Sequence, residues 1–169
     1  MMRNKFIILF IFIFIIFCIY TILINIYPKK YIEIIEKNTT IIDNFLVLSV
    51  IKAESNFNKN IVSKKDAKGL MQIRDITASE YEYTDLFNEE DNIKIGVKYL
   101  EKLYIKYDKN IYLTLAAYNA GMGNVDKWIH DKTITNNFNL DNIDKIPFLE
   151  TKNYIKKVIN SYNIYKILY

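Results

Sequence analysis

The chain has 169 residues, of which 51% are hydrophobic and 15% aromatic, so it can bury a substantial core. Its 23 basic and 19 acidic residues give a net charge of +4, too even a balance for an electrostatic nucleic-acid surface. The lysine pairs at 64–65 and 156–157 are typical of solvated surface. Cys18 is the single cysteine and His130 the single histidine, which excludes an intramolecular disulfide and a Cys/His zinc site. We therefore expect no metal centre and no nucleic-acid partner.

The N-terminal segment has the length and composition of a membrane helix. Residues 6–27, FIILFIFIFIIFCIYTILINIY, carry no charge and follow the basic MMRNK, and about 20 apolar residues suffice to cross the hydrocarbon core. A cleavable signal peptide has a shorter apolar region and a small-residue exit site. The bulky Phe17 also disfavours lipoprotein cleavage before Cys18. The pattern favours an uncleaved signal anchor over residues 1–28, although basic residues at both ends leave its orientation undecided by charge.

The remainder of the chain is predicted to be mainly α-helical, beginning with a connector and a first short helix over 29–42. Apolar residues recur at helical spacing in the segments 43–54, 73–83, 92–107, 111–119, 124–131 and 150–168. Asp43 can cap the first of these, and the second is expected to begin near Asp75. The polar stretch 132–145 is expected to be a loop. No period-2 strand and no internal repeat is found in the sequence.

Glu54 stands out because it lies on the apolar side of its helix. At ~100° per residue it falls in the middle of an arc formed by Leu46, Val47, Val50 and Ile51. A carboxyl group in apolar surroundings loses hydration, which raises its pKa. A Glu that is protonated near neutral pH can act as a general acid on a glycosidic oxygen. A helix-end Glu satisfied by backbone groups or by Lys68 is the alternative, and Glu54 alone does not decide between the two.

Four sequence blocks resemble, in the same order, the motifs of lysozyme-like lytic transglycosylases. They are ESNFNKNIVSKKDAKGLMQI at 54–73, NIKIGVKYL at 92–100, AAYNAG at 116–121 and PFLETKNYIKKV at 147–158. The resemblance covers about 45–158, nearly all of the chain beyond the anchor. It implies a lysozyme-like helical domain, which we place at residues 43–169.

The resemblance implies a role for each matching position. Glu54 corresponds to the catalytic acid/base of the family. The positions that correspond to substrate-binding or site-lining residues are Ser63, Gln72, Tyr118, Asn119, Glu150 and Tyr154. Met71, Phe57 and tyrosines are expected to offer apolar faces to the sugar rings. The glycines at positions 69, 121 and 123 are expected to form tight turns that shape the groove.

The implied activity is cleavage of the β-1,4 bond between N-acetylmuramic acid and N-acetylglucosamine in peptidoglycan, with formation of 1,6-anhydro ends. One Glu protonates the leaving oxygen and then accepts the proton of the muramoyl C6 hydroxyl, and no metal or organic cofactor takes part. The membrane is the second expected partner, through a single-pass anchor that leaves the catalytic domain on the extracytoplasmic side, facing the wall. Protein partners stay open. Two alternatives are a muramidase that uses water on the same fold and a non-catalytic peptidoglycan-binding module.

Two positions depart from the family pattern. Many members carry Met after GLMQI, whereas this chain has Arg74, which is expected either to face solvent or to contact a peptide or lactyl carboxylate. Many members carry Gly before the Ala that precedes GLMQ, whereas this chain has Asp66, a residue type that tolerates left-handed backbone geometry. Both departures concern subsite detail and not the reaction class.

Overall fold

The structure, a computed structural model, describes residues 2–169, with side chains from residue 5 onward. Met1, the first residue of the expected anchor, and the side chain of Arg3 in its basic flank lie outside the described residues. The described part is mainly α-helical, as predicted, and its only extended pairings are two isolated bridges, Val62–Lys68 and Lys68–Ile73. The helices are α1 (Met2–Ile26), α2 (Ile32–Asn38), α3 (Asn44–Ser55), α4 (Asp75–Ala78), α5 (Glu89–Lys106), α6 (Ile111–Ala120), α7 (Met122–His130), the 3₁₀ helix η1 (Leu140–Lys145) and α8 (Leu149–Leu168).

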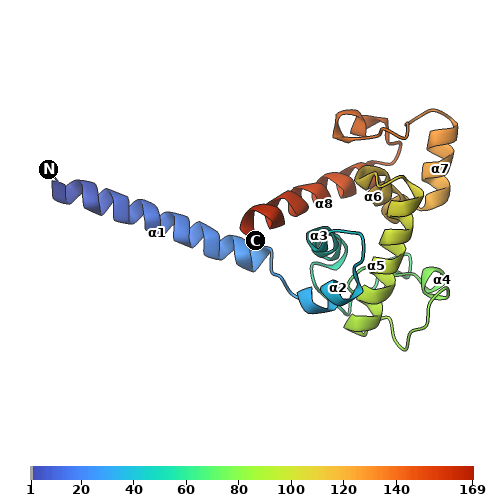
Figure 1. Cartoon of the computed structure of the whole chain (residues 1–169), viewed down its shortest axis with the longest axis horizontal. Helices are drawn as coiled ribbons and strands as arrows, with labels where there is room; N and C mark the ends of the chain where they lie inside the picture. Colours follow the sequence, from blue (N-terminus) through green and yellow to red (C-terminus); the bar gives the residue numbers. More distant parts are fainter. Residues whose placement is uncertain (1) are drawn as a thin grey trace.

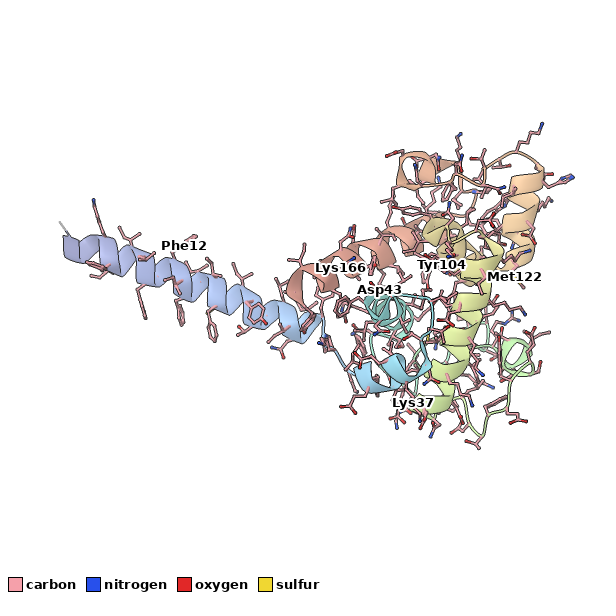
Figure 2. All side chains as sticks on the ribbon, viewed as in Figure 1. Phe12, Lys37, Asp43, Tyr104, Met122 and Lys166 are labelled. Carbon is pink, nitrogen blue, oxygen red and sulfur yellow. The ribbon has the colours of Figure 1, made fainter. Side chains whose placement is uncertain are left out.

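Helix α1 projects away from the rest of the protein (Figure 1). Its side chains, Phe12 among them, point into open surroundings (Figure 2), and the segment Lys5–Ile26 is long and apolar enough to cross a membrane. Side chains of α3, of α8 and of Tyr169, which follows α8, bind the carbonyl groups at the end of α1 and just beyond it. These hydrogen bonds are Lys52 Nζ to Ile26 O at 2.6 Å, Tyr169 Oη to Tyr27 O at 3.0 Å and Tyr165 Oη to Pro28 O at 3.0 Å. The helix therefore leaves the domain from a fixed point.

Helix α3 is the central helix of the domain. It packs along α8 and also contacts α2, while α5 packs against α2 and α6, and α6 against α8 and α7 (Figure 1). All four residues of the predicted apolar arc are buried, and so is Ser49 on the opposite side of the helix, whose hydroxyl donates to the Phe45 carbonyl at 2.6 Å. Because α3 is covered on almost every side, a carboxylate in its last turn lies at the edge of the core.

Helix α5 fixes the loop that contains GLMQI, residues 69–73. Asn92 on α5 is 1% exposed, and its amide is fully used by that region. Its oxygen accepts from Met71 N at 2.8 Å, and its nitrogen donates to Lys68 O at 2.9 Å and Leu86 O at 2.8 Å. One turn further along α5, Gly96 makes room for the Met71 side chain, since a Cβ at position 96 would lie 2.3 Å from Met71 Sδ. Thus α5 fixes both the backbone of this loop, through Asn92, and the Met71 side chain, through the space beside Gly96.

Two predicted segments differ from the structure. The helix expected over 73–83 is α4, which ends at Ala78, where the next two residues, Ser79 and Glu80, are exposed. The loop expected over 132–145 contains η1, because the Asn139 side chain accepts from Asp141 N at 2.9 Å and begins a helical turn.

The predicted glycine turns are present at two of the three positions. Gly69 and Gly121 adopt φ values of +75° and +88°, which favour glycine. Gly123 does not form a turn, because it lies inside the first turn of α7. Asp66 has a φ of +57°, the left-handed geometry that its residue type tolerates.

Replacing Asn92 by Ala is expected to destabilise the fold. The change leaves the Met71 N–H and the buried Leu86 carbonyl without their partner and removes one of the two donors to the Lys68 carbonyl, which should lower the free energy of unfolding by roughly 3 kcal/mol. Urea unfolding of the full chain in detergent micelles measures this change. Asn160→Ala is the matched control, since Asn160 is exposed on α8 and should change stability by less than about 0.5 kcal/mol. Equal stability of the two variants would contradict the role assigned to Asn92.

Candidate active site

A cavity of about 370 Å³ opens at the end of α3, beside Glu54. Six of the seven site residues predicted from the sequence line it, namely Glu54, Ser63, Gln72, Tyr118, Asn119 and Glu150. They come from α3, the loop before α4, α6 and α8. The seventh, Tyr154, does not line the cavity but is buried next to Glu54. The fold therefore brings together residues that lie up to a hundred positions apart.

The surroundings of the Glu54 carboxyl group bring its pKa close to neutral pH. Burial raises the pKa of Glu54 to about 7, and the nearby Glu150 adds to the rise. Contact with Tyr154 and the positive charge of Lys157 act in the opposite direction and limit the rise in pKa. Lys157 is fixed near Glu54 by a hydrogen bond from its Nζ to the Ala53 carbonyl at 2.7 Å. At pH 7 a substantial fraction of Glu54 is therefore protonated.

Two buried tyrosines flank this carboxyl group. The Tyr118 hydroxyl donates to the Met71 carbonyl at 2.8 Å, which ties α6 to the loop. The Tyr154 hydroxyl is buried and makes no hydrogen bond of standard geometry within the described residues, although it approaches Glu54 closely enough to affect its pKa. Burial, and secondly the Glu54 charge, raises the pKa of both tyrosines well above its ordinary value, so both remain neutral.

The other polar residues of the cavity are partly used by the protein itself. Ser63 Oγ accepts two backbone N–H groups of its own turn, each at 3.1 Å. Gln72 Nε2 donates to two loop carbonyls at 2.9 and 3.2 Å, and Asn119 Oδ1 accepts from the Thr151 hydroxyl at 2.7 Å. Each residue keeps one group without a partner in the described structure: the Ser63 proton, the Gln72 oxygen and the Asn119 nitrogen. These are the donors and acceptors that sugar hydroxyl and acetamido groups require.

Some functional expectations from the sequence need correction. Met71 does not offer a face to a sugar ring, because it is fully buried against Gly96. Phe57 is half-buried against the core, and its expected contact with a sugar ring stays a prediction. The pair at 64–65, predicted to be plain solvated surface, lines the cavity although both lysines are exposed, and Lys157 acts on Glu54. No pattern in the sequence around these lysines distinguishes them from other surface lysines. His130 lies at the exposed end of α7, away from the cavity.

The chain is similar to known proteins over almost all of its length beyond α1. Residues 31–140 match the family model of the transglycosylase SLT domain. A putative soluble lytic murein transglycosylase from Haemophilus influenzae is 33% identical over 150 residues, which cover 83% of this chain and 25% of that protein. Membrane-bound lytic murein transglycosylase C from Edwardsiella ictaluri is 28% identical over 185 residues, covering 88% of this chain and 52% of that protein.

The fold is also similar to that of a solved structure. The crystal structure of the 70 kDa soluble lytic transglycosylase from Escherichia coli matches with a TM-score of 0.79 and 29% sequence identity, over 86% of this chain and 25% of that one. The chain spans about a quarter of the length of the soluble relatives it matches. Because the family model covers more than half of the sequence, this chain belongs to the lysozyme-like transglycosylase SLT domain family.

Proposed function

We propose that this chain is a membrane-anchored peptidoglycan lytic transglycosylase in which Glu54 is the catalytic residue. The observation that carries the proposal is a carboxyl group with a pKa of about 7 that opens into a cavity lined by sugar-binding types of side chain. The relatives named lytic murein transglycosylases support the same reaction class. In this proposal residues 1–28 form the anchor, 29–42 a connector with the first short helix, and 43–169 the catalytic domain.

The proposed reaction uses Glu54 twice. Its protonated carboxyl group donates a proton to the glycosidic oxygen as the bond to C1 of the muramoyl sugar breaks. The N-acetyl group of that sugar stabilises the positive charge that develops at C1. The Glu54 carboxylate then accepts the proton of the C6 hydroxyl, whose oxygen closes onto C1 and forms the 1,6-anhydro ring. The proton is thus returned to Glu54 and no water is consumed.

The second carboxylate of the cavity is unsuited to the nucleophile role of an ordinary retaining glycosidase. The Glu150 side chain is 74% exposed, and Lys65 Nζ lies 3.8 Å from its carboxylate. We assign Glu150 to substrate binding, together with Ser63, Gln72 and Asn119. Of the tyrosines, Tyr154 contacts Glu54 directly and Tyr118 keeps the loop in place below the sugar, and both belong to the binding set.

The proposed location is the cell membrane, with one pass through the bilayer. Helix α1 supports it by its length and apolar composition, and a relative named as membrane-bound supports it by similarity. Peptidoglycan lies outside the cytoplasmic membrane, so the catalytic domain belongs on the extracytoplasmic side. The nearly balanced charges on the two sides of the anchor do not determine its orientation, so the orientation proposed here rests on the location of the substrate.

Digestion of purified peptidoglycan by the full chain in detergent is expected to release 1,6-anhydro muropeptides. Mass spectrometry detects them as products that lack one water relative to reducing muropeptides. Glu54→Gln should lower kcat/KM by about 10³-fold, because the amide cannot donate the proton. Reducing ends alone would instead establish the muramidase, and full activity of Glu54→Gln would contradict the assignment of Glu54.

The pH dependence of activity should follow the protonation of Glu54. Because the protonated carboxyl group is the acid, kcat/KM is expected to fall as pH rises through about 7. Lys157→Met should move this fall to higher pH and Glu150→Gln to lower pH, since the two charges act on the Glu54 pKa in opposite directions. A rate profile that stays flat to pH 9, or two shifts in the same direction, would contradict this origin of the pH dependence.

The free energy of unfolding should also depend on pH through Glu54. The folded chain keeps the Glu54 proton up to about pH 7, whereas the unfolded chain loses it near 4.5, so unfolding releases a proton between these values. Rising pH therefore destabilises the wild type across this window, and Glu54→Gln should gain roughly 3 kcal/mol relative to it between pH 4 and pH 8. Urea unfolding at both pH values measures the gain. The exposed Glu82→Gln should show none.

A further inference from the structure

A second cavity of about 320 Å³ adjoins the one beside Glu54. The two share five lining residues, which are Lys65, Gln72, Arg74, Tyr118 and Asn119. Part of the remaining wall is apolar, and it is formed by Ile76 in α4, Tyr99 in α5 and Ala120 in α6. Ile76 is 73% exposed although it lies beside this cavity. The groove therefore continues from the catalytic carboxyl group, past Arg74, over an apolar floor.

This second cavity carries positive charge that the described residues do not neutralise. Lys65 and Arg74 line it, and no carboxylate does. Asp75 follows Arg74 in the chain, but both of its carboxylate oxygens accept from Lys68 Nζ at 2.8 Å. Arg74 itself makes no side-chain hydrogen bond or ion pair within residues 5–169. Lys65 forms an ion pair with Glu150 at 3.8 Å, and such an exposed pair contributes little.

The backbone of Arg74 is held in place although its side chain is free to meet a ligand. Lys68 and Ile73 exchange two N–H···O bonds of 2.9 Å just before it. Just after it, the first turn of α4 bonds back to the Arg74 carbonyl at 2.9 and 3.0 Å. A guanidinium group offers two parallel N–H donors that match the two oxygens of a carboxylate. The side chain is thus presented from a rigid position at the border of the two cavities.

We propose that this second cavity binds a free carboxylate of the peptide stem carried by the muramoyl sugar, and that Arg74 determines the preference for peptide-bearing glycan. The proposal rests on the proposed function. A peptide stem combines carboxylates with small methyl-bearing side chains. Arg74 and Lys65 fit the first, and the exposed Ile76 fits the second. A glycan strand without peptides would leave both the charge and the apolar floor of this cavity unoccupied.

The test compares two glycan substrates, both freed of phosphate-containing wall polymers. One keeps its peptide stems, and in the other an amidase has removed them, which leaves the lactyl carboxylate on each muramoyl sugar. We expect the full chain to cleave the peptide-bearing strands with a kcat/KM about tenfold higher, as one charge-assisted hydrogen-bonded pair provides. Arg74→Met introduces the residue type that many family members carry at this position. It should lower kcat/KM for the peptide-bearing strands about tenfold. For strands without peptide stems, kcat/KM of this variant should stay within about twofold of the wild-type value.

Lys127→Met is the matched control, because Lys127 is exposed on α7 and lines neither cavity. It should leave both rates unchanged. An equal loss on both substrates in Arg74→Met would place the contact on a part of the glycan that both strands share and overturn the proposal, as would a wild type without preference.

Binding of the two glycans to the full-length Glu54→Gln chain separates this proposal from the catalytic one. Glu54→Gln should bind peptide-bearing strands more tightly than stripped strands, and adding Arg74→Met should remove this preference. That result supports the subsite even if no turnover is found. Equal binding of both strands by Glu54→Gln overturns it, whatever the activity of the wild type.

Discussion

The Met71 peptide group is the point on which the candidate site depends. Its N–H is held by the buried Asn92 of α5, its carbonyl by the Tyr118 hydroxyl of α6, and its side chain fills the space that Gly96 leaves open. Because both polar atoms and the side chain are fixed by different helices, the loop around Met71 has one place to lie. The neighbouring cavity residue Gln72 follows Met71 directly in this fixed stretch of the loop.

Part of this arrangement follows from the sequence and part does not. Helical periodicity predicts all the long helices, and the position of Glu54 among apolar residues predicts the direction in which its carboxyl group points. The contacts that build the loop are not visible in a periodic pattern, because Asn92 and Tyr118 reach Met71 across 21 and 47 positions. For the same reason the motif match marks Gln72 and Ser63 as site residues but does not reveal that both amide donors of Gln72 and both acceptor positions of the Ser63 hydroxyl are used within the loop.

The electrostatics of the site show a similar limit. Burial of Glu54 can be expected from its helix face, but the resulting pKa depends on Lys157 and Glu150, which reach the site only because α8 packs along α3. Likewise, the lysines at 64–65 are ordinary surface residues by sequence and become groove residues by the path of the loop. A pKa near 7 is therefore a property of the packed helices and not of the motif alone.

The junction between α1 and the domain sets the mechanical behaviour of the protein. The last carbonyl groups of a helix normally lack partners, and here those at the end of α1 and just beyond it are bound by side chains of the helical domain. One of these side chains, Lys52, belongs to the same helix as Glu54 and lies one turn from the C-terminal end of that helix. When α1 lies in a bilayer, these hydrogen bonds restrict the rotation of the helical domain about the end of α1. In the function proposed above, these bonds keep the groove at one height and one tilt above the membrane, so that only glycan strands passing at that height meet Glu54.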